Sequence, residues 1–232
     1  DHATRVRQVD LENEQWHWSP HQWIKEDVYT QPFPLDNVFT RMSLQQVVKT
    51  YLTAGFEHIV PWGMDHILFV LGIFLLSARL RPLLWQVTMF TVAHSITLTL
   101  AMLGIVELSA QIVEPLIALS IAYIALENVF KPGLHKSRLW IVFAFGLLHG
   151  MGFASMLSEF GMPRDDFALA LIAFNVGIEF GQLAVIAVAW LMLGFWFRDQ
   201  LRYRQLVVIP LSLLIGMVGL YWFWQRIEWT MI

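Results

Sequence analysis

The chain has 232 residues, of which 57% are hydrophobic and 14% charged, and its formal net charge is −3. Its mean hydropathy is +0.56. A soluble domain would carry about 25% charged residues, well above the 14% found in this chain. This composition excludes an ordinary soluble domain, and the lack of cysteine excludes disulfides, thiolate metal sites and cysteine nucleophiles. We therefore expect a polytopic protein of the lipid bilayer, without a nucleic-acid partner.

The first 53 residues differ from the rest, because they are polar, mixed in charge and rich in tryptophan and proline. They are too few to build much of a core. We predict an external segment, residues 1–53, that ends in an interfacial helix over 43–53, with Ser43 as the N-cap. The chain begins at Asp1 rather than at a methionine, which indicates either a removed signal peptide or a shortened chain.

The remainder, residues 54–232, predicts an all-α transmembrane domain, since runs of about 20 apolar residues suffice to cross a bilayer as helices. Basic or helix-breaking residues separate about six such runs, which cover residues 60–78, 84–106, 111–130, 139–158, 167–196 and 205–225. The fifth run is long for a simple span. It is tilted, extended beyond the bilayer, or interrupted near Gly177 and Gly181.

Basic residues in the short loops predict the orientation of the helices. The loops after the first, third and fifth runs hold Arg79 and Arg81; Lys131, Lys136 and Arg138; and Arg198, Arg202 and Arg204. The loops after the second and fourth runs hold only Arg164. Because cytoplasmic loops carry the excess of Lys and Arg, we expect both termini outside. We expect the membrane to be the bacterial inner membrane, with the N-terminus in the periplasm.

Polar side chains inside these runs lie at similar depths. Helices rise about 1.5 Å per residue, which places most of the ionisable groups between the outer surface and the middle of the membrane. Each costs a few kcal/mol there, so such groups normally face a bundle interior or a wet cavity. His58 and Asp65 share a helix face if the helix is continuous, and Pro61 could break it.

Imidazole and carboxylate together, without thiolate, suit borderline divalent metals. The predicted ligands are His58, Asp65, His66, His94, His149 and Glu179. Residues around them or along an ion path are Glu114, Glu127, Asn128, Asn175 and Gln182. Asp65 and His66 also have a structural interpretation as an interhelical hydrogen bond, and His94 as a histidine bonded to a serine or a carbonyl. For Glu114 the structural interpretation is a carboxylate at the interface that begins a helix. For Glu127 and Asn128 an ion pair at a helix end, beside Lys131, is the preferred interpretation.

Five ordered motifs resemble those of the HupE/UreJ family of hydrogenase and urease accessory membrane proteins. They are "HIVPWGMDHILFVLGIFLL" (58–76), "FTVAHSITLTLA" (90–101), "VEPLIALSIAYIALENVF" (113–130), "FGLLHGMGFAS" (145–155) and "FNVGIEFGQL" (174–183). The resemblance covers about residues 55 to 225. It implies a helical membrane protein associated with nickel supply, with metal sites at the His/Asp-His and His-Gly motifs.

Two departures from the nickel permeases of this group indicate a second branch, whose members carry an external N-terminal portion. In the motif of those permeases, five residues separate the first His from the Asp-His pair. In this chain, six residues separate His58 from Asp65. Their His-Gly motif is followed by a Glu, whereas Phe153-Ala154-Ser155 stands here.

The leading hypothesis is a carrier or facilitator for a divalent transition metal, rather than an enzyme. Nickel is favoured, with zinc, cobalt and iron as alternatives. Metal would enter near His58 and leave past Glu127, and protons would compete with it for the histidines at acidic pH. Three other functions stay open: an intramembrane zinc hydrolase, a b-type haem subunit, and a non-catalytic partner in a larger membrane complex or homo-oligomer.

Overall fold

The computed structural model describes residues 2–4, 7–10, 15–18, 22–24, 42–77, 79–106, 108–131, 133–135, 137–160, 163, 166–193 and 200–228. Three basic residues used for the predicted orientation lie outside these ranges, namely Lys136, Arg164 and Arg198. The chain divides into two compact units, Asp1–Arg41 and Met42–Ile232. The boundary that we predicted at 53/54 falls inside the first helix of the second unit.

The first unit contains four short strands. β1 (His2–Thr4) pairs antiparallel with β4 (Gln22–Ile24), and β2 (Arg7–Asp10) pairs antiparallel with β3 (Gln15–Trp18). The sequence analysis did not anticipate these strands. A strand signal is present in hindsight, because Gln15 to Trp18 alternates polar residues with tryptophan, which is typical of a strand with one apolar face.

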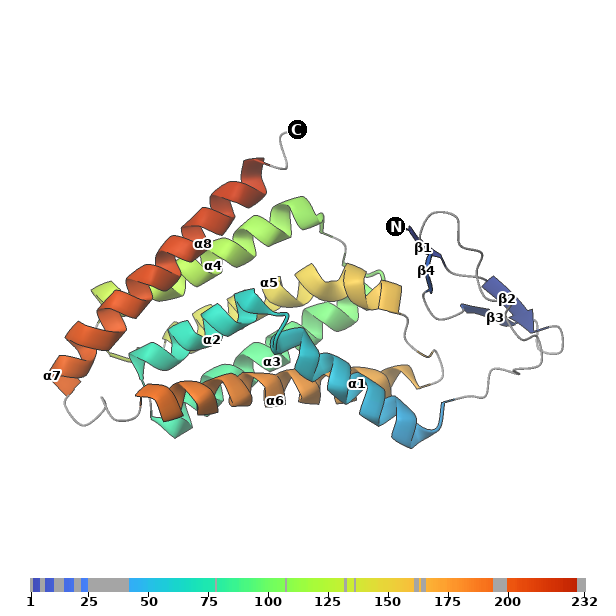
Figure 1. Cartoon of the computed structure of the whole chain (residues 1–232), viewed down its shortest axis with the longest axis horizontal. Coiled ribbons are helices and arrows are strands. Elements are labelled where there is room, and N and C mark those ends of the chain that lie inside the picture. Colours follow the sequence, from blue (N-terminus) through green and yellow to red (C-terminus); the bar gives the residue numbers. More distant parts are fainter. Residues whose placement is uncertain are drawn as a thin grey trace. The chain divides into compact units, whose positions relative to one another are not determined.

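The second unit is all-α in its described residues, which confirms the predicted fold class for this part of the chain (Figure 1). Its elements are α1 (Leu44–Ile59), α2 (Met64–Leu76), α3 (Leu80–Met102), α4 (Ala110–Phe130), α5 (Ser137–Phe160), α6 (Phe167–Leu193), α7 (Gln200–Tyr203), the π-helical segment η2 (Arg204–Val208) and α8 (Ile209–Glu228). Each of the six predicted apolar runs therefore contains a helix. α6 is continuous over its 27 residues, so the fifth run is not interrupted near Gly177 or Gly181.

Four helical stretches are long and apolar enough to cross a membrane: α3, α4, α6 and Arg204–Ile227, which joins η2 to α8. α1 and α2 together form a fifth candidate, bent by 69° at its break. The apolar stretch found in α5, Ser137–Phe153, is shorter. The protein is thus a helical membrane protein with four or five candidate spans by length and composition, and the number six stays a prediction.

The break between α1 and α2 follows from the local sequence. α1 begins with a capping box, in which Ser43 Oγ accepts from the Gln46 backbone N–H at 3.3 Å and Gln46 Oε1 accepts from the Ser43 backbone N–H at 2.8 Å. α1 ends at Ile59, and Pro61, which has no N–H to continue a helix, follows. The continuous helix that would align His58 with Asp65 is therefore not formed.

Glycines let the helices pack closely in pairs. α1 packs along α6, α3 along α5, and α4 along α8. A Cβ at Gly55 would collide with the backbone carbonyl of Phe174, and a Cβ at Gly177 would collide with that of Leu52. The backbones of α1 and α6 thus touch directly, which fixes the position of His58 near the end of α1.

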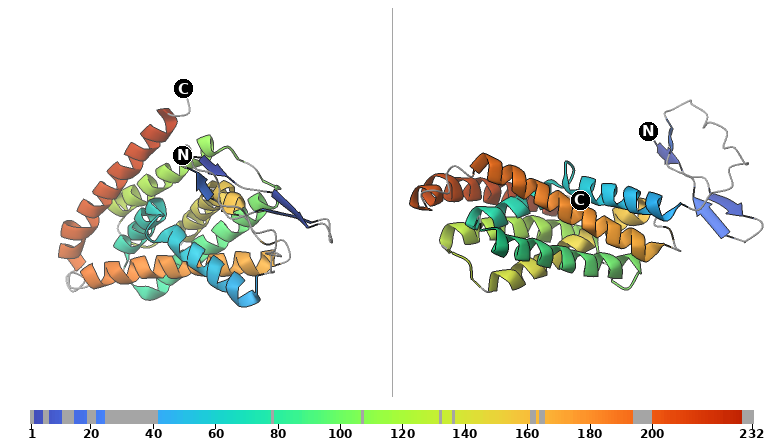
Figure 2. Two further views of the ribbon diagram at one scale, coloured as in Figure 1. Left: turned by 45° about the vertical axis from the view of Figure 1, so that its right-hand side comes forward. Right: turned by 90° about the horizontal axis from the view of Figure 1, so that it is seen from below.

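α2 is the central helix of this unit. It packs against α1, α3, α4, α6 and α8, and the two views in Figure 2 show it among them. A helix that is apolar on all sides is stable only when buried. The buried residues of α2 are His66, Phe69, Val70, Gly72, Ile73, Phe74 and Leu75. α2 has 13 residues, about 20 Å at 1.5 Å each, so it is too short to cross a bilayer alone.

Candidate metal centre

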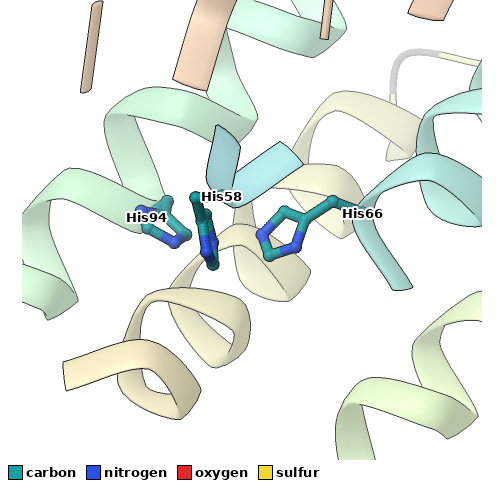
Figure 3. Close-up of side chains that lie close together, drawn as sticks. All are labelled: His58, His66 and His94. Atoms are coloured by element: carbon teal, nitrogen blue, oxygen red, sulfur yellow. The ribbon is translucent and has the colours of Figure 1, made fainter. Parts of the chain in front are cut away.

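Four histidines from four helices meet in the interior of the second unit. His58 lies at the end of α1, His66 in the first turn of α2, His94 in the middle of α3, and His149 in α5. The ring centroids of His66 and His58 are 4.7 Å apart, as are those of His66 and His149, and those of His66 and His94 are 5.7 Å apart. Figure 3 shows the rings of His58, His66 and His94 side by side.

Nitrogen and oxygen atoms of this cluster form two sets that suit a metal ion. One set is His58, His66 and His94, the other is Asp65, His66 and His149, and within each set the ligand atoms lie within 4.8 Å of one another. His66 belongs to both sets. We call these five residues, His58, Asp65, His66, His94 and His149, the histidine centre.

Asp65 holds the ring of His66 in place. Its Oδ1 accepts a hydrogen bond from the His66 backbone N–H at 2.9 Å and lies 3.1 Å from His66 Nδ1. A carboxylate on one ring nitrogen fixes the tautomer and leaves the other nitrogen, Nε2, as the free donor atom. Ser120 Oγ similarly lies 3.2 Å from His149 Nε2 and leaves His149 Nδ1 without a partner.

The remaining ring nitrogens of the centre are buried and lack hydrogen-bond partners within the described chain. They are His58 Nε2, His66 Nε2, both nitrogens of His94, and His149 Nδ1. Buried polar atoms are normally paired, since an unpaired one costs about 1–3 kcal/mol. A metal ion with bonds of about 2.0–2.1 Å to nitrogen would satisfy several of them after small side-chain movements. The donor atoms therefore fit a metal ion.

Phenylalanine rings surround the histidines. The ring centroid of Phe153 lies 3.8 Å from that of His58, and the centroid of Phe90 lies 5.0 Å from that of His149. Phe69 and Phe174 also contact the cluster. An apolar shell limits water access and strengthens electrostatic interactions at a metal site.

The predicted residues of α6 lie beside the histidine centre rather than in it. Glu179 Oε1 accepts a hydrogen bond from Thr88 Oγ1 at 2.7 Å, and Gln182 Oε1 accepts one from Thr91 Oγ1 at 2.9 Å. Neither donor set found in the described chain includes Glu179. Asn175 donates to the carbonyl of Leu171 at 2.8 Å.

Glu127 and Asn128 belong to a buried ion-pair network at the other end of α2. Arg138 Nη1 donates to Glu127 Oε2 at 2.7 Å, Arg138 Nη2 donates to Asn128 Oδ1 at 3.1 Å, and Arg138 Nε donates to Gln86 Oε1 at 2.9 Å. Lys131, the partner considered from sequence, lies 4.0 Å from Glu127 Oε1. An ion pair at this helix end is present as expected, but Arg138 makes its closer contact.

Glu114 contacts Arg226 of α8 rather than a residue of the histidine centre or of the Arg138 network. Its carboxylate lies 4.0 Å from Arg226 Nε, and its backbone carbonyl accepts from Arg226 Nη1 at 2.9 Å. The contacts of Glu114 in the described chain therefore tie the start of α4 to the end of α8.

Sequence reasoning missed Arg138 and Ser120. Arg138 is 1% exposed, but the positive-inside count treated it as a loop residue. The signal that would have identified it is Glu127, because a carboxylate inside an apolar run needs a cation as a partner. Ser120 gives no distinguishing signal, because a single serine in an apolar helix is common at helix contacts.

Fold and centre together define the class of the protein: a helical membrane protein with a buried cluster of side chains that could hold a metal ion. A family model described as HupE / UreJ protein matches residues 35–226. Since this match covers most of the chain, the protein belongs to the HupE/UreJ family, as the motifs predicted. The family indicates a role in nickel or cobalt uptake or as an accessory protein of metalloenzymes. No curated protein and no solved structure matches the chain.

Proposed function

We propose that the protein is a membrane carrier for a divalent transition-metal ion, and that nickel is its cargo. The observation that carries the proposal is the convergence of His58, His66, His94 and His149 from four helices, with buried ring nitrogens that lack hydrogen-bond partners in the described chain. Four helices have to hold their positions to keep these nitrogens together. A purely structural role for four histidines would leave their polar atoms paired.

The choice of nickel rests on the family together with the chemistry of the donor atoms. Imidazole nitrogen and a single carboxylate suit Ni²⁺, Co²⁺ and Zn²⁺, and affinity order alone does not select among them. Family membership favours nickel or cobalt. A centre without thiolate also binds these ions less tightly than a cysteine site, which suits a carrier that has to release its cargo.

The test is metal binding and uptake by the purified full chain. Elemental analysis should find close to one nickel per chain after loading, and proteoliposomes should take up Ni²⁺ faster than protein-free vesicles. Uptake should fall at acidic pH, because protonated imidazole cannot coordinate a metal. Uptake at the protein-free rate, with no bound metal, would contradict the proposal and favour the role of a membrane partner in a larger complex.

The second donor set supports a second candidate function. Asp65, His66 and His149 provide two imidazoles and a carboxylate, which is a ligand set used by zinc enzymes that keep one coordination position for water. A tightly held zinc ion that does not exchange with Ni²⁺, together with hydrolysis of lipid or amide substrates, would favour this candidate over transport.

A further inference from the structure

The two donor sets of the histidine centre have one residue in common. His66 belongs to both, whereas His58 and His94 belong only to the first set, and Asp65 and His149 only to the second. The ring centroid of His66 lies 4.7 Å from that of His58 and 4.7 Å from that of His149. We call the first set the trihistidine set and the second the aspartate set.

Each set has donor atoms that are free to bind an ion. In the trihistidine set, drawn in Figure 3, His58 Nε2, His66 Nε2 and both ring nitrogens of His94 are buried and lack hydrogen-bond partners in the described chain. In the aspartate set, His149 Nδ1 is in the same condition, and Asp65 adds a carboxylate. Three protein ligands and a water molecule complete a four-coordinate site, so either set is sufficient by itself.

The centre does not suit two ions at the same time. Asp65 contributes the one carboxylate of the two sets, and two divalent ions would place four positive charges beside it. The surrounding phenylalanine rings form a medium in which like charges repel strongly. His66 would also have to serve both ions, although its Nδ1 lies 3.1 Å from Asp65 Oδ1 and only its Nε2 is free.

We infer that the histidine centre holds a single cargo ion in two alternative positions, and that His66 stays a ligand while the ion passes between them. In one position the other ligands are His58 and His94. In the second position they are Asp65 and His149. The passage rests on the proposed function, whereas the two positions rest on the donor sets alone. Because His66 is shared, the ion keeps a protein ligand and is never bare in an apolar environment.

Helix α4 gives this passage a direction. Ser120 of α4 contacts His149 Nε2 at 3.2 Å. Glu127 lies seven residues further along α4, on the same helix face and about 10 Å away at 1.5 Å per residue. Its Oε1 is buried and has no hydrogen-bond partner in the described chain. The aspartate set therefore lies toward Glu127, the predicted exit, and the trihistidine set contains His58, the predicted entry.

The test is a titration of the purified full chain with Co²⁺, whose visible absorption depends on its ligands. The parent chain should bind one Co²⁺. His94→Ala, which leaves the aspartate set intact, and His149→Ala, which leaves the trihistidine set intact, should each still bind one Co²⁺ with different spectra. The parent spectrum should be a weighted sum of these two. His58→Ala and Asp65→Asn replace either variant if it does not fold.

The affinities distinguish two positions from one large site. Binding constants of alternative positions add, so at least one of the two single variants should weaken Co²⁺ binding by no more than about twofold. The double variant His94→Ala/His149→Ala should weaken it by far more than the product of the single losses. Two Co²⁺ per parent chain would overturn the inference. So would losses above about 10-fold in both single variants that simply multiply in the double variant.

Uptake of Co²⁺ into proteoliposomes tests the passage separately. His94→Ala and His149→Ala should both lose uptake although they bind the ion, because it stays in the remaining position. His135→Ala, in the exposed loop after α4, is the control and should bind and transport like the parent chain. Uptake at the parent rate in either variant would contradict passage through both positions. A parent chain that shows both positions by absorption but no uptake would contradict the proposed function and leave the two positions standing.

Discussion

Among the single residues of the histidine centre, His66 is the one that both donor sets contain. Loss of His58 or His149 removes one donor from one set. Loss of His66 removes a donor from both, and it also leaves Asp65 without the ring that it orients. Metal binding by the histidine centre should therefore depend more on His66 than on His58 or His149.

We expect His66→Ala to weaken Ni²⁺ binding by more than about 100-fold, and His58→Ala or His149→Ala to weaken it less. Changes in groups that only orient a ligand already cost about 10–100-fold. Isothermal titration of the purified variants with Ni²⁺ measures this order. His135→Ala, an exposed histidine in the loop after α4, is the control and should bind like the parent chain. Equal losses for all three centre variants would contradict the shared role of His66.

Arg138 tests the buried network at the other end of α2. Removing one partner of a buried ion pair costs about 3–5 kcal/mol, because the other charge stays buried and unpaired. Arg138→Met should therefore lower the free energy of unfolding by about that amount. Lys131→Met, which removes an exposed cation 4.0 Å from the same carboxylate, should cost at most about 1 kcal/mol. Unfolding in mixed micelles titrated with a denaturing detergent measures both.

The double variant Arg138→Met/Glu127→Leu provides the control for this prediction. Replacing both charges with apolar groups removes the unpaired carboxylate, so much of the lost stability should return. If the double variant is as unstable as the sum of the two single variants, Arg138 and Glu127 are not energetically coupled.

Five of the six predicted ligands converge in the histidine centre, and the sixth, Glu179, shows what a sequence does not reveal. Depth along a helix is readable from position, so histidines at similar depths were expected to lie in one layer. The direction in which a side chain faces depends on how each helix is rotated against its neighbours. Glu179 was expected at the depth of the others, but its carboxylate accepts a hydrogen bond from Thr88 of α3 instead of joining them. For the same reason Arg138 and its partners were not predictable as a network.

The contact between α1 and α6 governs the centre at the scale of elements. Gly55 and Gly177 bring the two backbones together, and His58 lies three residues beyond Gly55. An added methyl group at Gly55 has to separate the helices, since the atom that it meets belongs to the backbone of Phe174 rather than to a flexible side chain. Metal binding should therefore depend on a residue that never touches the metal.

Gly55→Ala should lower both the Tm and the affinity for Ni²⁺. Gly216→Ala is the matched control, because a Cβ there would meet only the Cβ of Ala125 at 3.4 Å, an ordinary contact. Alanine is favoured over glycine in a helix by about 0.5–1 kcal/mol, so Gly216→Ala should leave the Tm unchanged or raise it. Differential scanning fluorimetry and a Ni²⁺ titration of the two variants check this. A Gly55→Ala protein as stable as Gly216→Ala would show that α1 is free to shift.

Helix positions were predictable from sequence to within a few residues, because each apolar run has clear breaks. Ser43 forms the predicted capping interaction at the start of α1. Two features were not predictable in the same way. α1 is longer than the expected 43–53 helix, because its burial against α6 extends it to Ile59. The strands of residues 2–24 are only three or four residues long, so even the alternating pattern of Gln15 to Trp18 covers just four residues and is a weak signal for a strand.

The orientation of the second unit is a prediction at the scale of the whole molecule. The natural lack of cysteine allows single cysteines to report the side of each loop. A membrane-impermeant maleimide should label Leu108→Cys, in the loop after α3, from outside intact cells. It should label His135→Cys, in the loop after α4, only after the cells are opened. Both positions are exposed. The reverse pattern would contradict the predicted orientation.

The short central helix has an electrostatic consequence for the cargo. The aligned peptide dipoles of a helix place about half a positive charge at its N-terminus, and α2 begins at Met64, directly before Asp65 and His66. Under the proposed function, a cation in the histidine centre would lie near the repelling end of α2. The carboxylate of Asp65 accepts a hydrogen bond from the His66 backbone N–H, in the first turn of this helix. Its full negative charge exceeds the half charge of the helix end, so the start of α2 would weaken the attraction of Asp65 for a cation without abolishing it, as suits a carrier that has to release its cargo.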